Sequence, residues 1–156
     1  MLATFKVLNG DIFAQYADIL INPVSLSGRF LLPTTKKFRE RFKKNHKIYK
    51  ARCKLFERGS IDLIDFLKPV ADYDRVHERN VLIINLPVAE SASHGVDMRV
   101  VKLSVHWLAE ILDSYSQDTV IHIPQFVVDA QVWSEIRELF ETNLARFAGT
   151  VCVFEN

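Results

Sequence analysis

Cysteine is scarce in this sequence of 156 residues, which contains only Cys53 and Cys152. The two cysteines lie far apart, and neither belongs to a Cys-x-x-Cys pair or to a paired Cys and His spacing. A disulfide framework and a zinc site both need such spacings, so neither is indicated. We expect reduced structural thiols, no metal site and no cofactor.

Long apolar runs are also missing. No stretch approaches about eighteen consecutive apolar residues, the length at which a membrane-spanning helix is indicated. The N-terminal residues MLATFKVLNGD lack the charged start, apolar run and cleavage site of a signal peptide. We therefore expect a soluble cytoplasmic protein with no membrane partner. The apolar content of 49% is enough for the core of a single domain over residues 1–156.

Acidic residues are nearly absent from one part of the chain, although the net charge is only +1. Residues 36–54 hold ten of the twenty basic side chains and one acid, Glu40, so this stretch carries +9 and the remainder −8. Cations interleaved with aromatic side chains suit nucleic-acid phosphates, and the candidate contacts are Lys43, Lys44 and Lys47. The alternative is a solvated helix face, because the aromatic residues recur at the spacing of a helix core.

Strand patterns and helix patterns alternate along the chain. Short apolar or alternating runs predict strands, whereas longer runs with apolar residues three or four apart predict helices. Strands alternating with long helices indicate an α/β fold, a three-layer α/β/α sandwich with a mixed central sheet. We expect strands at 3–8, 18–22, 61–67, 80–87, 119–124 and 150–156, helices from Thr34 or Thr35 to 53, over 96–115 and over 132–147, and a polar loop at 68–80.

Three of the expected central strands run into a proline. Pro23, Pro87 and Pro124 each mark the point where an apolar strand gives way to a loop. Ligands of α/β sheets bind outside the carboxyl ends of the central strands. We expect these three strand ends to converge on one crevice.

Several segments resemble the macrodomains, a family that binds ADP-ribose and in some branches hydrolyses its derivatives. Residues 9–12 resemble the family's Gly-Asp-Ile segment, residues 18–24 its Asp-Ala-Ile-Val-Asn-Pro-Val-Asn strand, and residues 83–87 its Ile-Ile-Asn-Phe-Pro strand. The best match is to the antitoxin-type ADP-ribosyl-glycohydrolase macrodomains. Gly28, Phe38, Phe42, Tyr49 and Cys53 fall on the template of that branch without a gap. The resemblance implies a macrodomain-like fold over nearly the whole chain.

The resemblance also implies a set of ligand-binding residues. At the adenine end, the Asp11 carboxylate accepts from the adenine amino group beside the Ile12 N–H, and Phe154 stacks on the ring. The alternative is that Asp11 only caps a turn and Phe154 only closes the core. The full implied set is Asp11, Ile12, Asn22, Ser25, Gly28, Phe126, Asp129 and Phe154.

Glycine is missing from both loops that cradle the diphosphate in this family. The first glycine turn falls on residues 30–33, where Pro33 has no N–H to offer and Leu32 replaces the catalytic lysine. The second loop, residues 124–133, contains no glycine. Ser25 stands where the family has an asparagine that binds the distal ribose, so reach and donor number both fall.

We therefore expect a macrodomain-like binding module with a degenerate ADP-ribose site, without catalytic activity, that binds an adenine nucleotide or an ADP-ribose-like ligand. One alternative is a protein- or RNA-interaction scaffold that binds no nucleotide, and another is residual ADP-ribosyl hydrolase activity. Ser91, Ser93 and His94 either line a remodelled pocket or form a plain polar loop. No histidine is assigned to a catalytic set.

Overall fold

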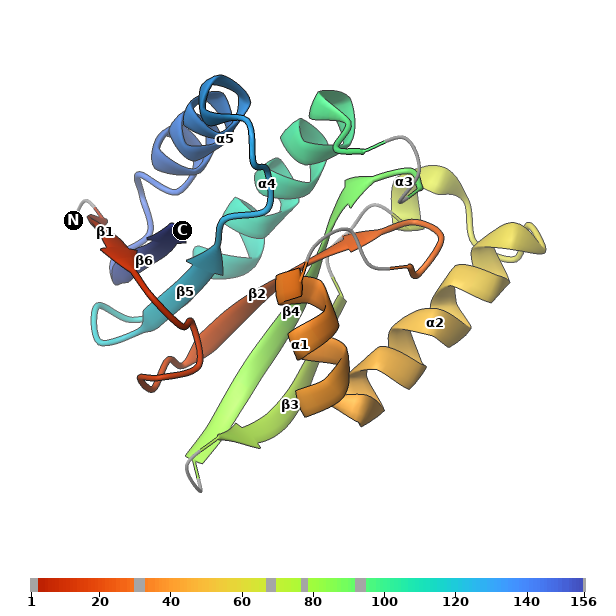
Figure 1. Ribbon diagram of the computed structural model, residues 1–156, viewed down its shortest axis with the longest axis horizontal. Helices are drawn as coiled ribbons and strands as arrows, with labels where there is room; N and C mark the ends of the chain where they lie inside the picture. Colours follow the sequence, from red (N-terminus) through yellow and green to blue (C-terminus); the bar gives the residue numbers. More distant parts are fainter. Residues whose placement is uncertain (1–2, 30–32, 67–69, 77–78, 92–94, 156) are drawn as a thin grey trace.

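A computed structural model describes residues 3–29, 33–66, 70–76, 79–91 and 95–155, and its strands form one six-stranded sheet (Figure 1). The strand order is β1-β6-β5-β2-β4-β3. Neighbouring strands are parallel except β3, which runs antiparallel to β4, so the predicted mixed sheet is confirmed. The strands are β1 (Thr4–Asn9), β2 (Ile19–Ser25), β3 (Val70–Val76), β4 (Arg79–Ala89), β5 (Val120–Pro124) and β6 (Thr150–Glu155).

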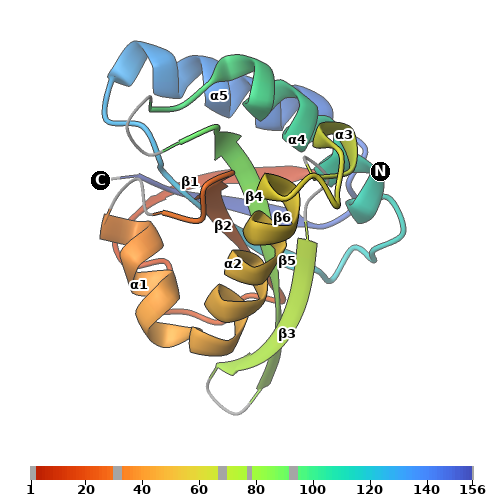
Figure 2. The same cartoon turned by 90° about the vertical axis from the view of Figure 1, so that its right-hand side faces the viewer.

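Helices cover both faces of the sheet, which confirms the predicted α/β/α sandwich. Figure 2 shows α4 and α5 on one face and α1 and α2 on the other. Within the described part of the chain, no helix has the length and apolarity needed to cross a bilayer. The helices are α1 (Pro33–Arg41), α2 (Lys43–Glu57), α3 (Leu63–Phe66), α4 (Met98–Leu112) and α5 (Ala130–Asn143).

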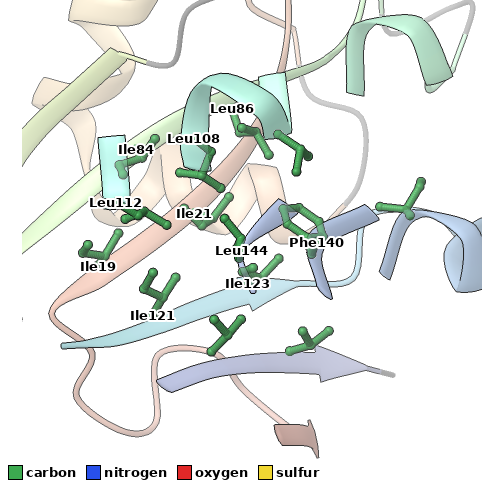
Figure 3. Close-up of a cluster of buried hydrophobic side chains, with 14 of the residues drawn as sticks. Ile19, Ile21, Ile84, Leu86, Leu108, Leu112, Ile121, Ile123, Phe140 and Leu144 are labelled. Atoms are coloured by element: carbon green, nitrogen blue, oxygen red, sulfur yellow. The ribbon is translucent and has the colours of Figure 1, made fainter. Parts of the chain in front are cut away.

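Strand β2 lies in the middle of the sheet and is buried along its whole length. Successive side chains of a strand point to opposite faces, so Ile19 and Ile21 pack toward α4 and α5, while Leu20 packs toward α1. Figure 3 shows Ile19 and Ile21 among the apolar side chains of the first cluster. Because helices cover both faces, the first three residues of the strand, Ile19 to Ile21, form a continuous apolar run, and the strand was predictable on that basis.

Helix α4 follows directly from its sequence pattern. Val101, Val105, Leu108 and Leu112 recur three or four residues apart and are fully buried against the sheet. The Asp97 side chain accepts a hydrogen bond from the Arg99 N–H at 2.9 Å and caps the first turn. The prediction of a helix over 96–115 is confirmed, with ends shorter by two or three residues.

The predicted strand at 61–67 is wrong. Residues 63–66 form the short helix α3, and the Asp62 Oδ1 accepts the Asp65 N–H at 2.9 Å. This bond from a side chain to a nearby backbone group favours a helical turn over an extended strand.

The predicted polar loop at 68–80 is also wrong where the structure describes it. Residues 70–76 form β3, which pairs with β4 from Val70 opposite Asn85 to Val76 opposite Arg79. Strand β3 lies at the edge of the sheet. An edge strand accommodates polar residues, so low hydrophobicity did not exclude a strand here.

The basic segment forms two helices, where the sequence pattern predicted one. Helix α1 begins at Pro33, so Thr34 and Thr35 lie inside it and neither precedes it as an N-cap. Phe42 separates α1 from α2, and its backbone is not helical (φ −120°, ψ 67°). Its ring is nevertheless buried beside that of Phe38, with ring centroids 5.9 Å apart, so the aromatic spacing correctly predicted the buried face.

Candidate functional site

Pro23, Pro87 and Pro124 lie toward the same edge of the sheet, as the sequence predicted, but only Pro124 ends its strand, because β2 continues to Ser25 and β4 to Ala89. Strands β5, β2 and β4 are neighbours and run parallel, so their carboxyl ends point the same way. Pro124 lies beside Phe154 of β6, which brings the end of the last strand to the same edge. This edge contains most of the residues in the predicted ligand set.

Asp11 and Ile12 follow β1 in a short turn. The Asp11 Oδ1 accepts the Phe13 N–H at 2.9 Å, and the Asp11 C=O accepts the Ala14 N–H at 3.1 Å. The Asp11 side chain is exposed, and within the described residues its Oδ2 and the Ile12 N–H make no hydrogen bond. The turn therefore presents one acceptor and one donor on adjacent residues, in addition to the turn-capping contact.

Phe154 and Ile12 are brought together by His122, a residue that sequence reasoning did not select. The His122 Nδ1 lies 3.1 Å from the Ile12 C=O, and its ring centroid lies 4.7 Å from that of Phe154. Burial lowers the pKa of His122, which keeps the imidazole neutral so that Nδ1–H can donate to the carbonyl. We call Ile12, His122 and Phe154 the adenine-end cluster.

Asn22 belongs to a buried group of three amides with Asn45 and Asn85. The Asn85 Oδ1 accepts from the Nδ2 of Asn22 at 2.9 Å and of Asn45 at 3.0 Å, and the Asn85 Nδ2 donates to the Asn45 Oδ1 at 2.9 Å. The Asn22 Oδ1 accepts no hydrogen bond from the described residues and borders a cavity of about 20 Å³. Asn22 is thus chiefly engaged in joining β2, β4 and α2.

Ser25 and Gly28 shape the loop after β2. Ser25 is fully buried, and its Oγ bonds the Ser27 Oγ at 2.9 Å and accepts the Arg29 N–H at 3.2 Å. Gly28 has φ +77°, a backbone conformation that residues with a side chain rarely adopt, and a Cβ there would lie 3.3 Å from Cys53 Sγ. The Ser25 hydroxyl is therefore used to fold its own loop.

Tyr49 ties this loop to α2. Its hydroxyl donates to the Ser25 C=O at 2.8 Å, and burial raises the pKa of the Tyr49 phenol well above its usual value. Burial likewise raises the pKa of the Cys53 thiol to about 11, so this cysteine is protonated at neutral pH. Neither side chain is poised as a nucleophile or base.

The second loop presents less to a ligand than the sequence suggested. Phe126 is 1% exposed, and its ring packs edge-on against Trp133 and Phe140, so the side chain is part of the core and does not face a ligand. Asp129 is exposed and is the N-cap of α5, where its Oδ1 accepts the Val132 N–H at 3.0 Å. A carboxylate thus occupies the helix N-terminus that would otherwise favour an anion.

Three residues of the altered first glycine turn, Phe30, Leu31 and Leu32, lie outside the described residues, as do Ser93 and His94 of the loop considered as a pocket lining. Only the backbone of Pro33 is described, as the first residue of α1. Ser91 borders a cavity of about 300 Å³ that is also lined by Ser27 and Arg29 of the loop after β2. No group of three or more His, Cys, Asp or Glu side chains suited to a metal ion occurs among the residues described.

Three residues of the site were missed by sequence reasoning: Asn45, Asn85 and His122. Asn85 and His122 lie inside the apolar strands 80–87 and 119–124. A polar residue within an otherwise apolar buried strand requires a partner, and this was the available signal. Asn45 had no such signal because it lies between the polar residues Lys44 and His46.

The structure has the fold of the macrodomains. The macrodomain of DarG from Thermus aquaticus superposes with a TM-score of 0.78 at 19% identity, and that of DarG from Mycobacterium tuberculosis with 0.73 at 13% identity; each alignment covers 99% of both chains. A Thermosipho africanus DarTG protein in complex with ADP-ribose aligns with a TM-score of 0.75 at 12% identity, over 99% of this chain and 43% of the other. No protein-family model and no curated protein sequence matches the chain.

Proposed function

We propose that this protein is a macrodomain-type binding module that retains the adenine end of an ADP-ribose site and does not hydrolyse its ligand. The observation that carries the proposal is the acceptor Asp11 Oδ2 next to the donor Ile12 N–H, neither of which bonds another described residue, beside His122 and Phe154. The DarTG protein with the same fold, solved in complex with ADP-ribose, supports the class of ligand.

The Asp11 and Ile12 pair matches the edge of adenine. Adenine presents an amino donor next to a ring-nitrogen acceptor, and such edges are read by hydrogen bonds together with stacking on apolar side chains. The Asp11 Oδ2 suits the amino group and the Ile12 N–H suits the ring nitrogen. Phe154, a residue that is 7% exposed and belongs to the same apolar cluster as Ile12, is the side chain on which the adenine ring would stack in this proposal.

Diphosphate binding is weakened in this proposal. The N-cap of helix α5 is Asp129, whose side chain occupies the helix N-terminus and whose negative charge repels a phosphate. The loop after β2 uses the Ser25 hydroxyl internally, and the sequence that follows offers Leu-Leu-Pro in place of glycines. The ligand's affinity would therefore come mainly from its adenosine half.

The absence of hydrolysis rests on the residues near the strand ends. The family's catalytic lysine falls on Leu32, which has no proton to transfer. Among the described residues of this edge, His122 is buried and its lowered pKa keeps it neutral, and Asp129 is engaged as a cap. We propose binding without turnover, for an adenine-containing small molecule and without a cofactor.

Calorimetric titration with ADP-ribose, AMP, IMP and ribose 5-phosphate tests the adenine end. IMP replaces the amino donor of adenine with a carbonyl acceptor and should bind at least about tenfold more weakly than AMP, or about 1.4 kcal/mol. ADP-ribose and AMP should bind with similar affinity, and ribose 5-phosphate should give no heat. No heat with either ADP-ribose or AMP would refute the proposal.

The matched variants are Asp11→Asn and Asp118→Asn. An asparagine at position 11 keeps one oxygen for the Phe13 N–H and replaces the second acceptor with a donor, so AMP affinity should fall at least about tenfold. Asp118 is exposed before β5, at the opposite end of the strands, so its variant should bind AMP as the wild type does. Equal affinities for all three proteins would place the ligand elsewhere.

A further inference from the structure

Helix α2 carries a row of four lysines on one face: Lys43, Lys47, Lys50 and Lys54. Their spacing of four, three and four residues places them on one side of a helix, and all four are exposed. At about 1.5 Å per residue, the row is about 16 Å long with a cation every 5–6 Å. Of the lysines proposed from the sequence, Lys43 and Lys47 lie in this row, and Lys44 lies on the adjacent side of the helix.

The row has no acidic counterpart within the described structure. The sequence contains no Asp or Glu from residue 41 to residue 56, and none of the four lysines forms an ion pair with a described residue. Four unpaired cations within about 16 Å repel one another in the free protein, and a polyanion relieves that repulsion.

A cavity of about 300 Å³ lies at the C-terminal end of the row. Lys50 and Lys54 border it from α2, and Arg29 borders it from the loop after β2. Ser27 and Ser91 add hydroxyl groups that can donate to an oxyanion. The lining contains three cations against one carboxylate, that of Glu57, so its net charge is positive.

We propose that the lysine row and this cavity bind the phosphate backbone of single-stranded nucleic acid. Proteins that bind single strands use a cationic track that follows the backbone, and the row with its cavity supplies a track and a concave end. A flexible single strand can place a phosphate in the cavity, whereas a rigid duplex can contact only the exposed row. The exposed side chains of α2 include no aromatic ring, so binding depends on phosphates and not on base identity.

This surface is separate from the adenine-end cluster. The cavity shares no lining residue with Ile12, His122 or Phe154. The loop after β2, which lines the cavity, is fixed to α2 by the bond from Tyr49 to the Ser25 C=O and by the close approach of Gly28 to Cys53. The two activities can therefore be tested independently, and either can fail without the other.

Fluorescence anisotropy with a labelled oligo-dT strand and a labelled duplex tests the proposal across a range of salt concentrations. The single strand should bind more tightly than the duplex. In Lys50→Gln/Lys54→Gln, affinity should fall at least about tenfold, and the slope of log K against log salt should become less negative by about 1.4, since each phosphate contact to a single strand contributes about 0.7.

The matched control is Lys102→Gln/Arg146→Gln. It removes the same charge from exposed residues of α4 and of the turn after α5, outside the row and cavity, so affinity should stay within about twofold of the wild type. An equal loss in this control would mean that only net charge matters and would overturn the site.

The variant Arg29→Gln separates the cavity from the row. It should weaken binding of the single strand several-fold and leave duplex binding unchanged. The role of the cavity would be overturned if the duplex bound as tightly as the single strand and Arg29→Gln left the affinity for the single strand unchanged. No anisotropy change with either probe would overturn the whole proposal.

Discussion

The two faces of the central sheet are built from different chemistry. The face toward α4 and α5 is filled by twenty buried apolar residues, and Ser104 is the buried polar residue described in those two helices. The face toward α1 and α2 has a second apolar cluster, which includes Leu20 and Phe38. Its strands also carry the buried polar residues Asn22, Asn85 and His122, and Tyr49 joins this face to the loop after β2. The first face is almost wholly apolar, whereas the second combines an apolar core with polar residues of the candidate site.

This division follows from the alternation of side chains along the strands. In β5, Ile121 and Ile123 point toward α5 and His122 points the other way. In β4, Ile84 and Leu86 belong to the apolar face and Asn85 does not. One strand therefore contributes to both faces, and polar residues in it do not interrupt the main core.

The largest expected effect is on the apolar face. Phe140 of α5 is fully buried among apolar residues and contacts the Phe126 ring, so Phe140→Ala leaves a cavity and should lower the free energy of unfolding by about 4 kcal/mol. Urea denaturation measures this loss. Ligand affinity of the folded protein should be unchanged, and a loss of affinity at full folding would show that the two faces are not independent.

An intermediate effect is expected on the polar face. Asn85→Leu leaves Asn22 Nδ2 and Asn45 without their shared acceptor and should cost about 3 kcal/mol, because buried unsatisfied polar groups cost about 1–3 kcal/mol each. The control is Asn80→Leu on the same strand, an exposed position that should change stability by less than about 0.5 kcal/mol. Equal costs for the two variants would contradict a role for the amide group.

The smallest expected effect is a dependence of stability on pH. Burial lowers the pKa of His122 in the folded protein, so the unfolded chain binds more protons once the pH falls below about 6.5. The contribution of His122 to the free energy of unfolding is therefore complete above that pH. It is lost as the pH falls toward the lowered pKa of the folded protein.

His122→Asn keeps a donor for the Ile12 C=O and does not titrate, so stability should fall less steeply between pH 7 and pH 5, which lie on either side of the ordinary histidine pKa of about 6.5. His46, whose pKa is also lowered by burial, contributes a slope of the same sign that remains in the variant. Urea denaturation at both pH values measures the free energy of unfolding. If this free energy falls by the same amount from pH 7 to pH 5 in the wild type and in the variant, this role of His122 is contradicted.

The fold was largely predictable from the sequence, and the failures have physical causes. The strands at residues 18–22, 80–87 and 119–124 are apolar because helices cover both their faces, so their pattern was unambiguous. Strand β3 lies at an edge, where a polar sequence is tolerated. Helix α3 is set by the Asp62 side chain, a contact that hydrophobic periodicity does not detect.

The candidate site was predictable in position and less so in composition. The resemblance selected Asp11, Ile12 and Phe154, and the structure brings Ile12 and Phe154 together. It did not select His122, which joins them, because this partnership spans 110 residues of sequence. Asn45 and Asn85 were missed for the same reason, since their pairing depends on how α2 lies against β4.

The contact of Trp133 at the end of β6 gives the molecule an internal optical reporter. Its Nε1–H donates to the Glu155 Oε2 at 2.6 Å, and Arg137 binds the same oxygen at 2.7 Å. The indole therefore lies beside a carboxylate and against the Phe126 ring of the second loop. A change in that loop alters the polarity around the indole, so the intrinsic emission of Trp133 reports on the strand ends without a label. Trp107 lies on α4, so replacing it with Phe isolates the emission of Trp133.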